Sequence, residues 1–463
     1  MIANKLFISY ALPLFIVLSS CNKDFLDKKP STSLVIPSTL AELVALLDNT
    51  TDCNATSALG NLSSDEYYFL NYDSYLSEAS ITTRNAYLWM KDLYGGETNI
   101  PDWNIPYRGI FIANSVLDAL SKITPTNFNE SQSWNHVKGW ALFIRAYLHY
   151  DLVSNFSPAY DHLTASIDLG IPIKLTANID EIVQRSSVKE TYDRIINDLE
   201  ESAYLMNATL PINNRNRPWK AAAYGMLSRV YLSMREYDKA ELYADSCLGM
   251  YSKLIDYNGI SPTSSTPFTN INDESIFSSH QVFTYLVTAS TTSVKSVSID
   301  TTLLSLYDST DLRLDLYYSK NASNYTRKRG YYGSGLYPYS GLATDEIYLI
   351  KAECLARRNE YDLSIDVLNT LLQKRYKDGT FVPLIASTAE DALEKVLQER
   401  RKELVFRGLR WVDLKRLNKE GANITLKRVL NDETYLLPPN DPRYVFPIPD
   451  DEIALSGISQ NIR

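Results

Sequence analysis

Two stretches of the chain repeat one spacing of large side chains, and this repeat limits the possible fold more than any other sequence feature. The first unit starts at Ala221 and the second at Asp345, and a Glu-Tyr dipeptide occupies the same turn in both. The spacing matches the tetratricopeptide pattern, in which helix pairs stack and bury a continuous core. Generic helix packing is the alternative, but the shared turn favours the repeat. The residues that carry the spacing are Tyr224, Leu227, Tyr231, Tyr237 and Ala240 in the first unit, and Tyr348, Ala352, Leu355, Tyr361, Leu368 and Leu371 in the second.

Amphipathic helical patterns extend on both sides of these units. Residues 252–340 are rich in Ser, Thr, Asn, Gly and Tyr without a helical period, so loops and short strands are expected there. The Pro-rich segment 419–463 is expected to form loops. The predicted fold is mainly α: one domain, residues 38–463, with helical repeats at about 104–250 and 344–418 around an irregular insertion. The predicted helices cover residues 39–48, 79–94, 104–121, 133–154, 188–207, 217–233, 236–250, 344–357, 361–376 and 388–418.

Residues 1–20 are predicted to be a signal peptide rather than part of the fold. Lys5 precedes an apolar run that is shorter than the roughly 20 residues needed to span a membrane. The run ends in Leu-Ser-Ser before Cys21, the pattern of a bacterial lipobox, so we expect cleavage before Cys21 and acylation of this residue. Residues 21–37 would then form a lipidated tether, because several acyl chains give stable membrane attachment. An ordinary signal peptide followed by a chance cysteine is the alternative.

The composition excludes several classes of function. A net charge of -9 does not supply the basic surface that nucleic acids require. The four histidines are dispersed without metal-ligand spacing, and no phosphate-binding, dinucleotide-binding or nucleophile motif is present. We therefore expect no catalytic residue, no metal and no cofactor. The remaining cysteines, Cys53, Cys247 and Cys354, are too few and too widely spaced for a disulfide framework.

The most enzyme-like stretch is the charged helix expected at residues 394–418. Its carboxylates Glu399 and Glu403 could in principle act as the acid–base pair of a glycosidase. They share a face with Arg400 and Arg407 at helical spacing, however, which is typical of ion pairs that brace a helix against its neighbour. We favour this structural interpretation over an enzyme.

Aromatic residues in loops are the strongest indication of ligand binding. The chain has 33 tyrosines, and sugar rings stack their C–H faces on aromatic rings while polar side chains bind their hydroxyls. Three segments combine both features: residues 65–68, the connection between Trp89 and Trp103, and the Gly-rich part of the insertion. Packing is the competing interpretation for each, and above all for Trp89. The predicted ligand-binding residues are Asp65, Tyr67, Tyr68, Trp89, Asn99, Trp103, Tyr285, Tyr331, Tyr332 and Tyr337.

Several motifs, which follow one another in a fixed order, carry a resemblance to a known family. They are Cys21-Asn-Lys-Asp-Phe-Leu-Asp-Lys-Lys-Pro30, Trp103-Asn-Ile-Pro-Tyr107, Asp345-Glu-Ile-Tyr-Leu-Ile-Lys-Ala-Glu353, Glu399-Arg-Arg-Lys-Glu-Leu-Val-Phe-Arg-Gly-Leu-Arg-Trp-Val-Asp-Leu-Lys-Arg416 and Tyr444-Val-Phe-Pro-Ile-Pro-Asp-Asp-Glu452. Together they resemble the SusD/RagB family of outer-membrane nutrient-binding lipoproteins over almost the whole mature chain. The chain departs from the family pattern at one position. Arg407 precedes Gly408 where the family usually has glutamate, which puts the ion pair expected there in doubt.

The resemblance implies a function as well as a fold. The protein would be a lipid-anchored, surface-exposed protein of the outer membrane, without a cofactor, that binds a glycan. It would deliver the glycan to a SusC-like TonB-dependent transporter, over which it sits as a lid. Two alternatives stay open: the same architecture could capture peptides, because the same loops could bind either ligand, or it could be a ligand-free scaffold that only docks the transporter.

Overall fold

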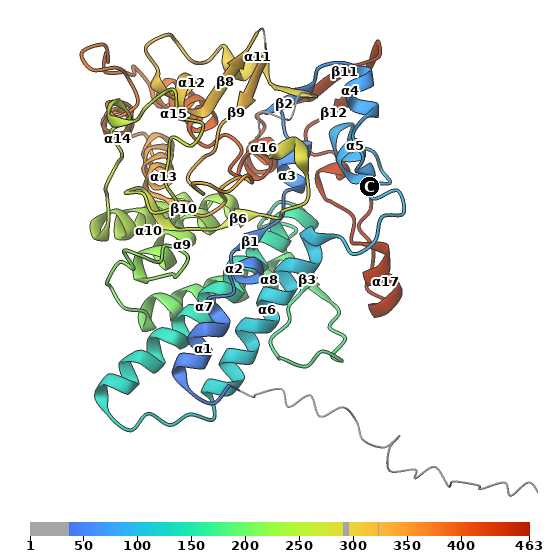
Figure 1. The fold of residues 1–463 in the computed structure, drawn as a ribbon, viewed down its shortest axis with the longest axis vertical. Helices are drawn as coiled ribbons and strands as arrows, with labels where there is room; N and C mark the ends of the chain where they lie inside the picture. The colour runs from blue at the N-terminus through green and yellow to red at the C-terminus, as the bar shows by residue number, and fades with distance from the viewer. Residues whose placement is uncertain (1–36, 290–295, 323) are drawn as a thin grey trace, which may run out of the picture. The chain divides into compact units, whose positions relative to one another are not determined.

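The computed structural model describes residues 37–289, 296–322 and 324–463, so the predicted lipidation site Cys21 lies outside the described residues. Residues Ser38–Arg463 form one compact unit. Helices are the main regular structure of this unit, and its short strands occur in pairs (Figure 1). The structure thus confirms the predicted mainly helical class.

Two observations on the described ranges bear on the predictions from composition. None of their helices is both long enough and apolar enough to cross a membrane. The side chains of Cys53, Cys247 and Cys354 are buried and their thiols are free.

Helices dominate the N-terminal part of the chain. The long helices α6 (Pro101–Leu120) and α7 (Phe128–Phe156) lie side by side, and α8 (Val188–Leu205) packs on α7. The second half of α7 is buried on all sides, so it forms the centre of the core. The other helices of this part are α1 (Leu40–Leu47), α2 (Thr50–Cys53), α3 (Leu59–Ser63), α4 (Tyr72–Leu76), α5 (Ile81–Tyr87), α9 (Lys220–Met234) and α10 (Tyr237–Met250).

The two helix pairs expected from the repeat are both formed. Helices α9 and α10 form one hairpin, α13 (Thr344–Arg357) and α14 (Tyr361–Leu372) form the other, and α10 packs on α13. Just before the Glu-Tyr dipeptide of each turn, a residue adopts the left-handed conformation: Arg235 with φ 65° and Asn359 with φ 68°. The turn that the two units share in sequence therefore has one backbone geometry, although membership of the tetratricopeptide class stays a prediction.

Short strands connect segments that are distant in the sequence. Strand β1 (Ala55–Thr56) runs parallel to β6 (His280–Gln281), and β2 (Tyr67–Phe69) runs antiparallel to β7 (Val297–Ile299). These pairs attach the insertion to the N-terminal helices. The insertion also holds the short helices α11 (Thr301–Leu304) and α12 (Leu312–Tyr317). The other strand pairs are β3 (Leu169–Pro172) with β4 (Arg185–Ser187), β5 (Ser275–Phe277) with β10 (Leu342–Ala343), β8 (Tyr318–Asn321) with β9 (Asn324–Arg327), and β11 (Leu426–Leu430) with β12 (Glu433–Leu437).

The last predicted helix is broken in two, as α15 (Ala389–Glu403) and α16 (Arg410–Lys419). Between them Phe406 and Gly408 have φ angles of 57° and 76°. The side chain of Asn61 fixes this bend: its Nδ2 donates to the Phe406 carbonyl at 2.9 Å, and its Oδ1 accepts from the Gly408 amide at 3.1 Å. Helical periodicity could not reveal the bend, because the residue that stabilises it lies in another part of the chain.

The C-terminal segment is more regular than the expected loops. Strands β11 and β12 form a tight hairpin, and helix α17 (Asp450–Ser456) follows. The two turn residues, Asn431 and Asp432, have φ angles of 52° and 62°. Asparagine and aspartate tolerate this left-handed conformation, and it matches the twist of a two-residue hairpin. The hairpin could have been predicted from the sequence, because this Asn-Asp dipeptide lies between two stretches that contain apolar residues.

We predict that His149 makes the fold less stable in acid. Both ring nitrogens of His149 are buried in α7 without a hydrogen-bond partner among the described residues. Desolvation lowers the pKa of His149 from 6.5 to about 3. Between these values the unfolded chain binds a proton that the folded chain does not, so stability falls as the pH falls, by up to about 1.4 kcal/mol per pH unit.

Thermal melts from about pH 6.5 to about pH 4 check this prediction. The apolar variant His149→Met should lose less stability over this window than the wild type, each protein being compared with its own value at the upper pH. Parallel curves for the two proteins would contradict the prediction.

Candidate functional site

Five of the predicted ligand-binding aromatics lie in the core, and one of them, Trp103, is described with helix α6 below. The side chains of Tyr67, Trp89, Tyr285 and Tyr331 are each exposed by 3% or less. A ring without an exposed face cannot stack on a sugar, so we reassign all four to packing. Their polar atoms are bound within the protein: Tyr67 Oη donates to the Leu62 carbonyl (2.9 Å), Trp89 Nε1 to the Ser63 carbonyl (2.9 Å), Tyr285 Oη to Asp102 Oδ2 (2.6 Å), and Tyr331 Oη to Glu274.

Two polar residues of the prediction have structural contacts. The carboxylate of Asp65 accepts bonds from Nε and Nη2 of Arg410 at 2.7 and 2.8 Å, and Arg401 lies 3.1 Å away. Burial alone would raise the pKa of Asp65. The two arginines lower this pKa by more than burial raises it, so the pKa of Asp65 is well below its ordinary value. Asn99 is exposed, with φ 55°, and its backbone amide donates to Asp451 at 2.8 Å. Because Arg410 is the first residue of α16, the ion pair between Asp65 and Arg410 stabilises the position of this helix.

Tyr332 and Tyr337 meet at the surface with Phe283, a residue that the sequence analysis did not select. The ring centroid of Phe283 lies 5.1 Å from that of Tyr337 and 4.1 Å from that of His280, over which it stacks. The Tyr332 ring lies 4.7 Å from His280. Phe283 is 48% exposed, and Tyr332 and Tyr337 are half-buried. Phe283, Tyr332 and Tyr337 form what we call the insertion aromatic cluster. Tyr68, which is also half-buried, lies on β2 outside it.

Glycines allow the loop to bring these rings together. Gly333 has φ 64°, a conformation that side chains disfavour, and a Cβ atom on Gly335 would overlap the Tyr332 ring. Burial lowers the pKa of His280, so its ring is uncharged at neutral pH beneath Phe283. The loop thus presents a fixed apolar surface. Phe283 could have been suspected from its position in the Gly- and Tyr-rich insertion, but its Val-Phe neighbourhood is typical of a buried strand.

A groove of about 590 Å³ runs along α6. Trp103, Tyr107 and Phe111 line one wall, because residues four apart lie on one side of a helix. Trp103 is almost fully buried and packs edge-on against Phe156 with a centroid distance of 4.9 Å, so it forms the base of the wall. Residues 172–179 supply the opposite wall. We call this site the α6 groove.

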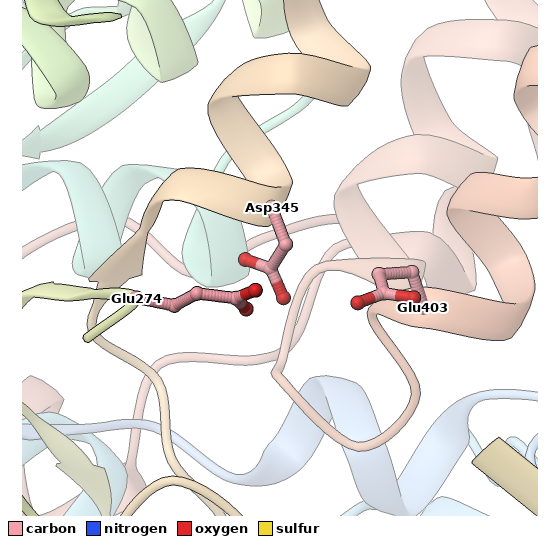
Figure 2. A group of neighbouring side chains, drawn as sticks. All are labelled: Glu274, Asp345 and Glu403. Atoms are coloured by element: carbon pink, nitrogen blue, oxygen red, sulfur yellow. The ribbon is translucent and has the colours of Figure 1, made fainter. Parts of the chain in front are cut away.

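Three carboxylates, those of Glu274, Asp345 and Glu403, converge in the interior (Figure 2). One oxygen of each lies within 4.8 Å of the others, a spacing that could suit a hard cation. Arginines already neutralise them, however: Arg375 binds Glu403 at 2.7 Å and Glu274 at 2.8 Å, and Arg407 binds Asp345 at 2.6 and 3.1 Å. The group is therefore a buried ion-pair network rather than a metal centre.

The network also settles the role of two residues considered in the sequence. Arg407, whose ion pair was in doubt, pairs with Asp345 and stacks 4.4 Å from the Tyr331 ring centroid. Glu403 binds Arg313 at 2.9 Å, so it pairs with a distant helix and not with its helical neighbours. Bracing by ion pairs was the right interpretation, but most partners come from other elements.

The fold is a helical scaffold that presents an aromatic cluster and a groove and pairs a group of buried carboxylates with arginines. Two family models match the chain. Residues 24–232 match one described as "starch-binding associating with outer membrane", and residues 316–462 match that of the SusD family. The chain belongs to the SusD/RagB family, as its motifs predicted.

Solved structures share the fold across the chain. A SusD superfamily protein from Bacteroides vulgatus is 22% identical, with a TM-score of 0.70, covering 92% of this chain and 99% of its own. A second B. vulgatus protein, described as a putative sugar binding protein, is 23% identical, with a TM-score of 0.72 and coverages of 92% and 98%. Surface glycan-binding protein A from Bacteroides fluxus is 17% identical, with a TM-score of 0.70 and coverages of 92% and 99%. No curated protein matches the chain.

We predict that the Arg407–Asp345 pair is essential to stability. The variant Arg407→Met should lose about 3–5 kcal/mol in urea unfolding, because it leaves the buried Asp345 carboxylate without its counter-charge. The double variant Arg407→Met with Asp345→Asn removes both charges and should recover much of this loss. Equal stabilities of the single and double variants would contradict the prediction.

Proposed function

We propose that the protein binds a glycan at the cell surface and delivers it to a SusC-like TonB-dependent transporter. The observation that carries the glycan part is the insertion aromatic cluster, in which Phe283, Tyr332 and Tyr337 lie together at a surface. Sugar C–H faces stack on such rings, and a fixed platform avoids the entropy loss of ordering a loop. The starch-binding description of the matching family model supports a glycan as ligand.

Binding is the whole of the proposed activity. The carboxylates that could have formed a glycosidase pair, Glu399 and Glu403, are buried and bound to Arg313 at 2.7 and 2.9 Å. Both are thus occupied as counter-charges of Arg313. Release of soluble product from a bound polysaccharide by the pure protein would contradict this part of the proposal.

Calorimetry of the protein from residue 22 onward, against a panel of polysaccharides and a peptide digest, tests the glycan part. We expect binding to a glycan that Phe283→Ala and Tyr337→Ala each weaken by about tenfold, the loss of one stacking contact. Tyr204→Ala is the matched control, because Tyr204 is 83% exposed on α8 outside the cluster. Binding of the digest alone would identify a peptide receptor instead, and no binding at all would favour a scaffold that only docks the transporter.

The lipid anchor and the transporter are tested in cells. Cys21→Ala should release the protein from the outer-membrane fraction, because the anchor requires the Cys21 thiol. Protease treatment of intact cells should cleave the wild type if it faces outward. A barrel transporter should co-purify with the wild type from solubilised outer membranes. Wild-type protein that resists the protease and purifies without a transporter would contradict both surface exposure and delivery.

A further inference from the structure

We propose that the α6 groove is a second carbohydrate-binding site, which takes a short neutral oligosaccharide. It lies along a helix of the N-terminal part, apart from the insertion aromatic cluster, and its volume of about 590 Å³ lies in the usual range for small-molecule sites, about 300–1,000 Å³. The inference rests on the proposed function only in the class of ligand. The residues that would bind the sugar are different ones.

The platform for a sugar ring is formed by Tyr107 and Phe111. They are one helical turn apart on α6, which separates them by about 6 Å along the helix axis. Tyr107 cannot rotate freely, because its ring packs against Trp103 at 4.9 Å and its hydroxyl donates to the Pro172 carbonyl at 3.0 Å. Phe111 is 40% exposed and lines the groove. The fold thus fixes one ring and leaves a second uncovered beside it.

The opposite wall is held open by a buried side chain. Asn114 donates from Nδ2 to the carbonyls of Lys174 and Thr176 at 3.0 and 3.1 Å. Its Oδ1 accepts from Arg145 at 3.0 Å, and Arg145 in turn binds both oxygens of Asp198 at 2.8 Å. This chain of bonds ties residues 174–176 to the core. The groove therefore exists before a ligand arrives, which lowers the entropic penalty of binding.

A glycine brings a charged pair to the edge of the groove. A Cβ atom at position 109 of α6 would lie 2.6 Å from the Asp52 carbonyl oxygen, so only glycine lets α2 approach this closely. Asp52 thereby accepts a bond from Nε of Arg108 at 2.9 Å. The pair, in which Arg108 is exposed and Asp52 is partly buried, offers an acceptor and several donors side by side, which suits neighbouring hydroxyls on one sugar ring.

The charges around the rings favour a neutral ligand. Arg108 and Lys174 contribute positive charge, while Asp52 and Glu452 contribute negative charge, and Asn178 adds an amide that both donates and accepts. An anion or a cation would be attracted by two of these charged side chains and repelled by the other two. A polyhydroxylated, uncharged ligand can bind all of them. Aromatic faces combined with this polar set identify a carbohydrate.

Hydrogen exchange tests the inference on the protein from residue 22 onward. The probe is a mixture of neutral oligosaccharides from partial digests of starch, xylan and mannan at millimolar concentration. We expect slower exchange of the amides at residues 173–179 when a sugar binds. Phe111→Ala should shift the concentration needed for this protection by about tenfold or more. Phe128→Ala, an aromatic that is 74% exposed at the start of α7, should leave it unchanged.

A second variant separates this inference from the proposed function. In Phe283→Ala the protection of residues 173–179 should persist, because the two sites share no residue. If it persists while no glycan binds the insertion aromatic cluster, the α6 groove is supported and the proposed cluster site fails. If Phe283→Ala abolishes it, the groove is no independent site and the inference fails. Protection by a peptide digest alone, or by no probe, would also overturn it. Thermal melts confirm that each variant is folded.

Discussion

The carboxylate of Glu403 connects three parts of the chain, and the rest of the structure depends on its ion pairs. One oxygen binds Arg313 of α12 at 2.9 Å, and the other binds Arg375 at 2.7 Å. Arg375 also binds Glu274, which accepts a bond from Tyr331 of the insertion. A buried charge costs several kcal/mol unless it is paired. The helices and the insertion must therefore assemble together, because neither can bury these charges alone.

This network also positions the ligand-binding surface that we propose. Tyr331 is anchored in the interior, and the next residue, Tyr332, belongs to the insertion aromatic cluster. Adjacent tyrosines thus have opposite tasks, one in packing and one at the surface. Few tyrosines of the described residues are exposed, and several of the buried ones, such as Tyr67, Tyr285 and Tyr331, bind polar groups of the core with their hydroxyls.

Periodicity predicted the long helices well, since helix burial depends on the residues of the helix itself, but the helix predicted at 79–94 is only α5, which ends at Tyr87. It failed where a distant residue decides the backbone, as at Gly408, which Asn61 holds in a bend. The site was harder to predict for the same reason. Tyr331 faces inward because its hydroxyl binds Glu274, which is distant in the sequence, and the groove beside Phe111 includes a loop that Asn114 holds. Local composition pointed to the Gly- and Tyr-rich loop, but it could not show which of its rings lie at the surface.

The Asn61 contacts have a consequence for how the chain matures. Asn61 and Phe406 are 345 positions apart. The bend between α15 and α16 can therefore be stabilised only when the two ends of the chain come together. Strand β1 likewise cannot pair until β6 has been synthesised. Contacts of such long range slow folding, since the intervening chain must be ordered first. In vectorial synthesis or export the N-terminal segment emerges long before its partners, and until then its strand edges and apolar faces are open to aggregation or to capture by chaperones.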